Sequence, residues 1–188
     1  MSGGNVFADV QFFTVEEGKT TVTELVMRDI KDQIRVIGNF DSEAKYLAVP
    51  DPNSDARTLK SVLETTGRGY FAVALVDYGT EPTNHAFMDI SAAARELEEW
   101  GRPLLVVFAS EEDYRKFRSE HFNLPSTVCF GIDADGTMRK MVATEMKLDK
   151  GGRLPLIVLA DTFNRVVFFS QGYTIGLGDR LVLTSKAL

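Results

Sequence analysis

The segment from Tyr78 to Phe87 holds residues whose types and spacing suit chemistry. Glu81 and His85 are four residues apart, so on a helix they share one face and can form an acid-base or ion pair. With Asn84 between them, they support one hypothesis, an enzyme that uses this turn. We favour a surface pair at a helix start, because the sequence shows no third partner for the histidine.

The same stretch also suits the start of a helix. Thr80 or Glu81 is placed to cap it, and Pro82 fits the first helical position. The Glu81 carboxylate would meet the positive end of the helix dipole. We therefore expect a capped helix start, and the alternative is a binding site formed by five consecutive residues: Glu81, Pro82, Thr83, Asn84 and His85.

Cys129 is the single cysteine of the chain, so no intrachain disulfide and no Cys-x-x-Cys couple can form. It lies in the apolar segment STVCFGI, where a strand interior would bury it and where nothing stabilises a thiolate. We expect an inert core thiol, and the alternative is a thiol enzyme that depends on Cys129.

The sequence predicts neither a metal site nor a cofactor. The two histidines, His85 and His121, have no H-E-x-x-H spacing and no cysteine pairs beside them. The segment Asp133 to Gly136 begins like a calcium loop but lacks the later acidic ligands, so it predicts a turn. GYTIGLG lacks the spacing of a dinucleotide-binding loop and predicts a loop before the last helix.

Composition limits the class of protein and its partners. The chain has 188 residues, 44% of them hydrophobic, and a formal charge of −6. That is enough to bury one α/β core with a small appendage. The acidic balance and the absence of basic runs argue against nucleic acid as a partner. No apolar run reaches the roughly 20 residues of a membrane helix, so we expect no membrane insertion.

From Tyr70 the sequence alternates between strand-like and helix-like segments. Residues 85–100 carry apolar side chains at spacings of three and four, which is typical of an amphipathic helix. Two apolar runs, 154–161 and 165–173, predict a hairpin, and 176–188 a last helix. The remaining expected elements are strands at 69–78, 103–110 and 126–133 and helices at 111–122 and 137–148. This order predicts a central sheet between helices.

The first part of the chain differs from the rest. Residues 6–15, 20–29 and 32–40 read as three strands of a small antiparallel β unit, which we expect to belong to a larger upstream β domain. Residues 48–56 predict a loop, and 57–69 a short helix that ends at Gly67 or Gly69. The predicted domains are a β-rich N-terminal segment, 1–45, and an α/β domain, 46–188.

The α/β part, from about Tyr70 to Leu188, resembles the thioredoxin-like fold of extracytoplasmic thiol-disulfide oxidoreductases and peroxiredoxin-like proteins. The segment RLPLIVLADTFNRVVFFSQGYTIGLGDRL carries most of the resemblance. It implies that Glu81 and Asn84 stand where the family has its two cysteines, and that Pro155 stands where the family has a cis-proline facing the active-site helix. We therefore expect a cis Leu154–Pro155 bond and, beside Glu81, a docking surface for an extended segment.

TTGRGYF, EPTNHAF, LPSTVCFGIDADG and ADTFNRVVFFSQGYTIGLG also resemble the C-terminal region of large bacterial transglutaminase-like proteins. In that family the Cys-His-Asp machinery would lie upstream of such a region. The resemblance implies an accessory domain, without transglutaminase activity of its own, in an extracytoplasmic parent protein at the periplasm or cell surface.

Three functional classes follow. The first is a non-catalytic, redox-inactive thioredoxin-like module that packs against other domains of its parent or binds an extended protein segment. The second is a cryptic enzyme that uses Glu81, Asn84 and His85, or Cys129. The third is a small-molecule binding domain that uses the pocket of the vacated active-site turn. We favour the first because both thiols are missing from that turn.

Overall fold

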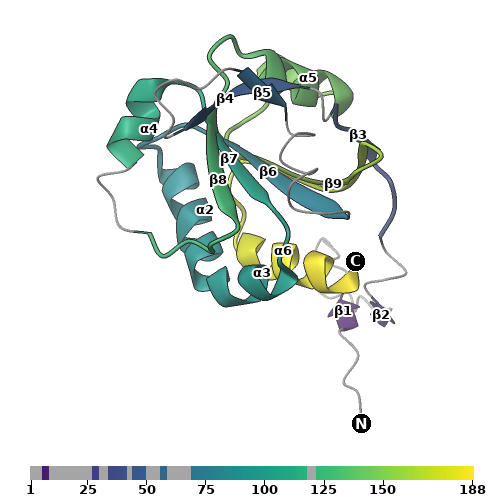
Figure 1. Cartoon of the computed structure of the whole chain (residues 1–188). Helices are drawn as coiled ribbons and strands as arrows, with labels where there is room; N and C mark the ends of the chain where they lie inside the picture. The colour runs from purple at the N-terminus through teal and green to yellow at the C-terminus, as the bar shows by residue number, and fades with distance from the viewer. Residues whose placement is uncertain are drawn as a thin grey trace, which may run out of the picture.

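The computed structural model describes residues 6–8, 27–29, 34–41, 44–49, 56–58, 69–117 and 122–188. Within these residues, eight strands form one mixed sheet in the spatial order β3-β10-β9-β6-β7-β8-β4-β5 (Figure 1). The strands are β3 (Gly38–Asn39), β4 (Lys45–Val49), β5 (Ala56–Thr58), β6 (Tyr70–Val76), β7 (Leu104–Phe108), β8 (Val128–Ile132), β9 (Leu156–Asp161) and β10 (Arg165–Gln171). Strands β6, β7 and β8 are parallel, and β9 pairs antiparallel with both β6 and β10.

Helices cover both faces of this sheet, as predicted. They are α2 (Glu81–Ala92), α3 (Ala94–Trp100), α4 (Glu111–Phe117), α5 (Thr137–Glu145) and α6 (Leu177–Ala187), with a short 3₁₀ helix, η2 (Asp149–Gly151). Successive strand residues point to opposite faces, so β6 and β7 feed two separate cores. Ala72, Ala74 and Val76 pack on the side of α2, α3, α4 and α6. Phe71, Val73 and Leu75 pack on the side of α5.

The predicted helix at 85–100 has the expected buried face, but it is two helices. Ala93 has φ −91° and ψ 8°, which ends α2, and α3 begins at the next residue. The predicted helix 111–122 is described only as α4, because 118–121, including His121, lie outside the described residues. The buried residues of α2 and α3 are Thr83, Ala86, Phe87, Ile90, Ala94 and Leu97.

The N-terminal interpretation needs two corrections. A separate antiparallel pair does exist, formed by β1 (Val6–Ala8) and β2 (Met27–Asp29). However, the third predicted strand joins the main sheet, because Gly38–Asn39 pairs with β10 and buried Phe40 packs edge-on against Phe71. The predicted domain boundary at residue 45 stays a prediction.

The second correction concerns 48–69, predicted as a loop and a short helix. Residues 48 and 49 end β4, and 56–58 form β5, which pairs antiparallel with β4. Because the two prolines of this stretch indicated a loop, the sequence interpretation missed this antiparallel pair of strands. Residues 59–68, where most of the predicted helix falls, lie outside the described residues.

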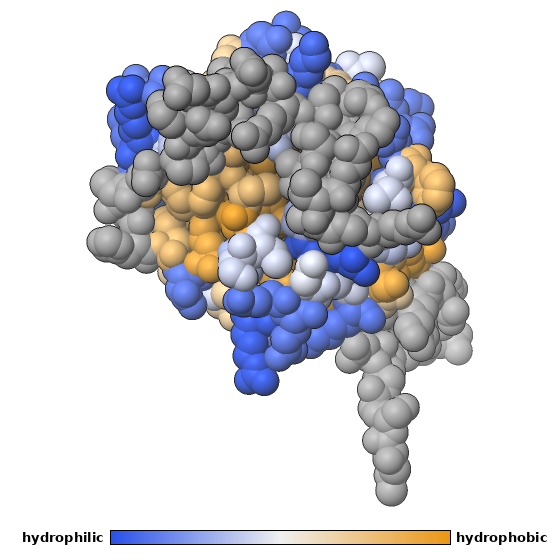
Figure 2. All heavy atoms as spheres, viewed as in Figure 1, coloured by the Kyte–Doolittle hydropathy of each residue, from blue (hydrophilic) through white to orange (hydrophobic). Residues whose placement is uncertain are grey.

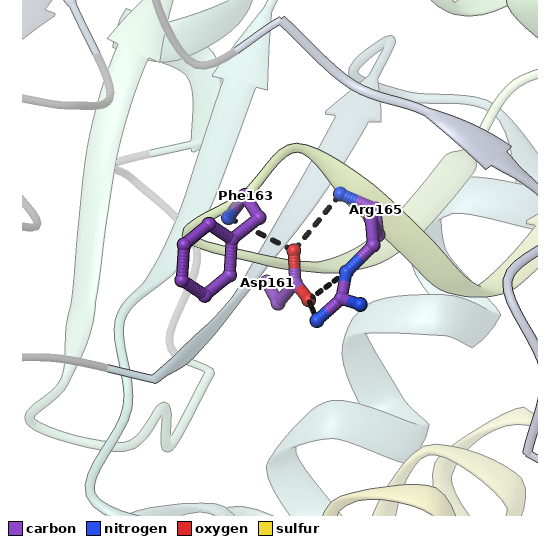
Figure 3. Close-up of polar contacts among 3 residues, drawn as sticks. All are labelled: Asp161, Phe163 and Arg165. Carbon is purple, nitrogen blue, oxygen red and sulfur yellow. Dashed lines mark hydrogen bonds and ion pairs between the residues drawn. The ribbon is translucent and has the colours of Figure 1, made fainter.

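The predicted β9–β10 hairpin is confirmed, and a buried carboxylate holds its turn (Figure 3). Asp161 accepts 2.9 Å hydrogen bonds from the backbone N–H groups of Phe163 and Arg165. The Arg165 guanidinium lies 2.7 Å from its other oxygen. Burial alone would raise the pKa of Asp161, but the hydrogen bonds from Arg165 and Phe163 and the Arg165 charge lower it on balance.

Candidate functional site

The first turn of α2 is fixed to the end of β6 by one carboxylate. Asp77 accepts a 2.9 Å hydrogen bond from the Thr80 hydroxyl and a 2.6 Å bond from the fully buried Thr83 hydroxyl. Thr80, one of the two predicted caps, is the N-cap residue, and its hydroxyl makes no capping bond because it donates to Asp77. Glu81 is the first helical residue, so Pro82 is the second and not the first as predicted. The spacing Asp77, Thr80, Thr83 was the sequence signal for this joint, since short polar side chains at such intervals bond locally.

The predicted site residues have different environments. Glu81 is exposed on 86% of its side chain and lies 3.5 Å from Nε2 of His85, so the predicted surface pair at the helix start is present. Asn84 is half-buried, and its N–H donates to the Thr80 carbonyl. Thr83 and Pro155 are buried, so neither offers a side chain to a partner. The Leu154–Pro155 bond is cis, as predicted.

A second group of residues, missed by the sequence interpretation, meets His85. The Tyr173 ring stacks on the His85 ring with centroids 5.0 Å apart, and its hydroxyl lies 3.4 Å from Asp89. Asp89 also accepts a bond from the N–H of Gly178 at the start of α6. Loss of hydration raises the pKa of Tyr173, with the Asp89 charge in the same direction. Tyr173 is far from His85 in sequence, so only the fold reveals this contact.

Gly178 explains why α6 lies so close to α2. A Cβ atom at this position would come within 2.8 Å of the Asp89 carbonyl oxygen. Only glycine lets the two helices approach to this separation. The contact between Asp89 and Gly178 therefore fixes the position of α6 against the face of α2 that carries His85.

This region of α2 and α6 exposes apolar surface beside an acidic hollow. Met88 on α2 is 58% exposed and Ile175, before α6, is 93% exposed. The hollow, about 330 Å³, is lined by Tyr173 and Ile175 together with three carboxylates, those of Asp89, Glu96 and Asp179. We call Glu81, His85, Met88, Tyr173 and Ile175 the α2 surface.

Cys129 lies in β8, as predicted, and is half-buried. Burial raises the pKa of its thiol to about 11. The side chain of Cys129 lies 3.9 Å from the Leu104 carbonyl of the neighbouring strand. Figure 2 shows apolar surface over β8, where Val128 and Phe130 are half-buried as well. The environment of Cys129 is therefore apolar and disfavours the thiolate.

A separate cavity of about 300 Å³ lies at the carboxyl ends of β6, β7 and β8. Its walls include Val76, Phe108, Asp133 and Arg139, and also Leu154, next to the predicted site residue Pro155. No residue from Glu81 to His85 lines it. The sequence did not predict this cavity, because the ends of three strands meet only in the folded sheet.

In the described part of the chain, no cluster of three or more histidine, cysteine or acidic side chains is arranged to hold a metal ion. Among the same residues, no helix has the length and apolar character that a membrane span requires. The segment Asp133 to Gly136, which begins like a calcium loop in the sequence, is a turn that leads into α5. Its Asp133 carboxylate accepts hydrogen bonds from the N–H groups of Met138 and Arg139.

Comparisons with known proteins give the fold. No protein-family model matches the sequence, and no curated protein sequence matches it. Peroxiredoxin Q of Xanthomonas campestris superimposes with a TM-score of 0.58 at 13% identity, over 81% of this chain and 98% of that chain. A putative thiol:disulfide interchange protein DsbE from Chlorobium tepidum gives 0.55 at 14% identity, over 79% and 96%.

The exposed lipoprotein thioredoxin Etrx1 of Streptococcus pneumoniae gives a TM-score of 0.54 at 14% identity, over 77% of this chain and all of that one. At such low identities a structural likeness shows the fold, and one fold serves many chemistries. The order of elements, the sheet topology and these neighbours together lead to one conclusion: the chain has the thioredoxin-like fold.

Proposed function

We propose that this chain is a redox-inactive thioredoxin-like module that binds protein, as an accessory domain of a larger transglutaminase-like protein. It packs against other domains of its parent or holds an extended segment of a partner. The transglutaminase-like part of the proposal rests on the resemblance of EPTNHAF and ADTFNRVVFFSQGYTIGLG to the C-terminal region of that family.

The position of the thiol carries the redox part of the proposal. Thiol-disulfide exchange needs an accessible thiolate and a second thiol to resolve the mixed disulfide. This chain has one cysteine, and its pKa is raised to about 11 by burial in β8. The first turn of α2, where the helix dipole would stabilise a thiolate, carries Glu81 and Asn84 instead.

The α2 surface supports protein binding. Met88, three residues after His85 on α2, and Ile175, two residues after Tyr173, both expose apolar side chains, and the His85 and Tyr173 rings stack on each other. Exposed apolar residues with aromatic neighbours and a polar rim are typical of interaction sites. Because the neighbouring hollow is lined by three carboxylates and no basic side chain, the complementary partner is a protein segment with apolar and basic residues.

The geometry gives less support to catalysis by Glu81, Asn84 and His85. Glu81 is almost fully exposed, and neither of the two cavities described above has Glu81, Asn84 or His85 in its walls. General acid-base chemistry needs a substrate held within hydrogen-bond reach of the acid or base. Neither of these cavities therefore holds a substrate against the Glu81–His85 pair.

Two turnover assays test the redox part. In one, reduction of insulin disulfides by dithiothreitol is followed with and without the chain; in the other, loss of hydroperoxide is followed. We expect rates equal to the protein-free control for the native chain and for Cys129→Ser. An acceleration by the native chain that Cys129→Ser abolishes would establish a thiol enzyme. One that survives Cys129→Ser but is lost in His85→Ala would establish a cryptic enzyme at α2.

The gene sequence preceding Met1 tests the accessory-domain part. A transglutaminase core with its Cys-His-Asp residues in the same reading frame is the expected result. A reading frame that starts at Met1, or that encodes an unrelated upstream domain, would contradict the accessory role while leaving the redox part unaffected.

A further inference from the structure

The cavity at the ends of β6, β7 and β8 lies where the topology of the sheet changes direction. After β7 the chain forms α4, whose Tyr114 and Phe117 pack on one face of the sheet. After β8 it forms α5, whose Met138 and Val142 pack on the other face (Figure 1). Adjacent parallel strands whose helices go to opposite faces leave a crevice at their carboxyl ends, the place where open α/β sheets bind ligands.

The walls of this cavity are mainly apolar. Its lining includes half-buried Leu154, before β9, and the ends of β6 and β7, where Leu75, Val76, Val107 and Phe108 have side chains almost fully buried in the two cores. Ala109 and Ala134, both exposed, stand at its rim. At about 300 Å³ the space fits a small organic molecule with an apolar body.

Arg139 supplies a positive charge that no carboxylate in the described part of the chain neutralises by an ion pair. Its Nε and one terminal nitrogen, Nη2, donate to the carbonyl oxygens of Gly151 and Gly152, at 3.4 and 3.3 Å. Those acceptors are neutral, so they orient the guanidinium without cancelling its charge. The other terminal nitrogen, Nη1, has no hydrogen-bond partner among the described residues. An arginine held in this way is suited to an anionic group.

The two carboxylates in the cavity wall already have partners. Asp133 is buried, and its two oxygens accept from the N–H groups of Met138 and Arg139 in the first turn of α5. Asp135 is exposed and accepts from the N–H of Thr137. These bonds also occupy the N-terminal N–H groups of α5, so the helix end itself is not the anion site. Arg139 is the group that remains to bind a ligand.

We propose that the cavity at the ends of β6, β7 and β8 binds a small carboxylic acid with an apolar tail. Arg139 holds the carboxylate, and the apolar side chains of Ala109, Ala134 and Leu154 contact the tail. This site is independent of the α2 surface, because the two share no residue.

Titration with three probes of equal tail length tests the proposal. Hexanoate, 1-hexanol and hexylamine are added to the ¹⁵N-labelled chain, and amide shifts are followed by NMR. For hexanoate we expect shifts at Ala109, Ala134 and Gly136, with a dissociation constant on the order of 1 mM for a ligand of this size. Hexanol and hexylamine should bind at least about tenfold more weakly, because they lack the charge-assisted bond to Arg139.

Two variants and matched controls locate the site. Arg139→Gln should weaken hexanoate about tenfold, whereas Arg95→Gln, which removes an exposed arginine of α3, should not. Ala109→Phe should fill the mouth and abolish binding without entering the core. Ala92→Phe, at an exposed alanine in the wall of the other hollow, should leave binding intact.

Hexanoate binding that weakens about tenfold in Arg139→Gln and is abolished in Ala109→Phe supports the proposal. Ala109→Phe keeps the test decisive if Arg139→Gln fails to fold. The proposal is overturned if hexanol binds as well as hexanoate, if hexanoate shifts only amides outside the cavity, or if it shifts none. It is also overturned if binding persists in Ala109→Phe.

Discussion

The buried hydroxyl of Thr83 donates a 2.6 Å hydrogen bond to the Asp77 carboxylate, and this bond ties the first turn of α2 to the end of β6. Thr80 donates to the same oxygen from the N-cap position. We infer that Thr80 and Thr83 serve the strand-to-helix joint. Their hydroxyls therefore hold this turn in place and are not free to act as reactive groups.

Thr83→Val tests this joint. Valine keeps the shape of threonine but removes the donor to Asp77, so we expect a loss of about 1–2 kcal/mol in the free energy of unfolding, measured with urea. Thr80→Val is the matched control: the Thr80 bond is longer and Thr80 is only half-buried, so this change should cost less. Equal stability of Thr83→Val and the native chain would show that the joint contributes nothing.

A second prediction tests whether Glu81 and Asn84 occupy the positions of a lost dithiol. Residues three apart at the start of a helix point to a common side, within the roughly 4.4–6.8 Å between Cα atoms that a disulfide needs. Glu81→Cys with Asn84→Cys should therefore form an intramolecular disulfide under mild oxidation. The thiol at 81 should have a pKa below the ordinary value of about 8.5, because the helix N-terminus stabilises its thiolate.

Thiol counting by mass spectrometry, before and after reduction, measures the pairing. The single variants Glu81→Cys and Asn84→Cys are the controls and should form no intramolecular bond with Cys129. A folded double variant in which the two new cysteines stay unpaired would mean that this turn is not the vacated active-site turn.

The third prediction concerns the pH dependence of stability through Asp161. The hydrogen bonds and charge of Arg165 lower the pKa of this carboxyl in the folded chain. A depressed folded pKa stabilises the fold above the unfolded value of about 3.9, and that stabilisation disappears as pH falls through the folded pKa. We expect Asp161→Asn to cost about 1–3 kcal/mol at pH 7, and the difference from the native chain to shrink below about pH 4.

Urea unfolding of both proteins across this pH range measures the difference. Asp135→Asn is the control, because Asp135 is exposed and its hydrogen bonds are local to one turn. A difference between Asp161→Asn and the native chain that is the same at pH 3 and pH 7 would show that the Asp161 charge does not stabilise the hairpin.

The sequence predicted the fold from Tyr70 onward because each segment carries the hydrophobic pattern of the element that it forms. The continuous apolar runs of β6 and β7 and the three- and four-residue spacing of α2 leave few alternatives. It missed β4 and β5, and it did not predict that the strand expected at 32–40 pairs with β10 through β3. β3 and β5 are only two and three residues long. Such short segments carry too little pattern, and their pairing is decided by tertiary contacts.

For the candidate sites, the sequence predicted the Glu81–His85 pair and the position of Cys129 because both depend on local spacing. It did not predict the stacking of Tyr173 on His85, the contact between Gly178 and Asp89, or the cavity beside Arg139. Each of these joins segments that are separated along the chain by a strand or a helix. These contacts depend on how the crossover connections arrange the strands and helices, which the residue types alone do not predict.

The central claim is that this thioredoxin-like chain has no reactive thiol, and the labelling rate of Cys129 tests it most directly. The native chain is treated with iodoacetamide at pH 8, with glutathione and the chain unfolded in guanidinium chloride as references. Because the pKa of Cys129 is raised to about 11, its thiolate is scarce at this pH. We expect labelling slower than the references by on the order of a hundredfold. Labelling of native Cys129 as fast as glutathione, or faster, would contradict the claim.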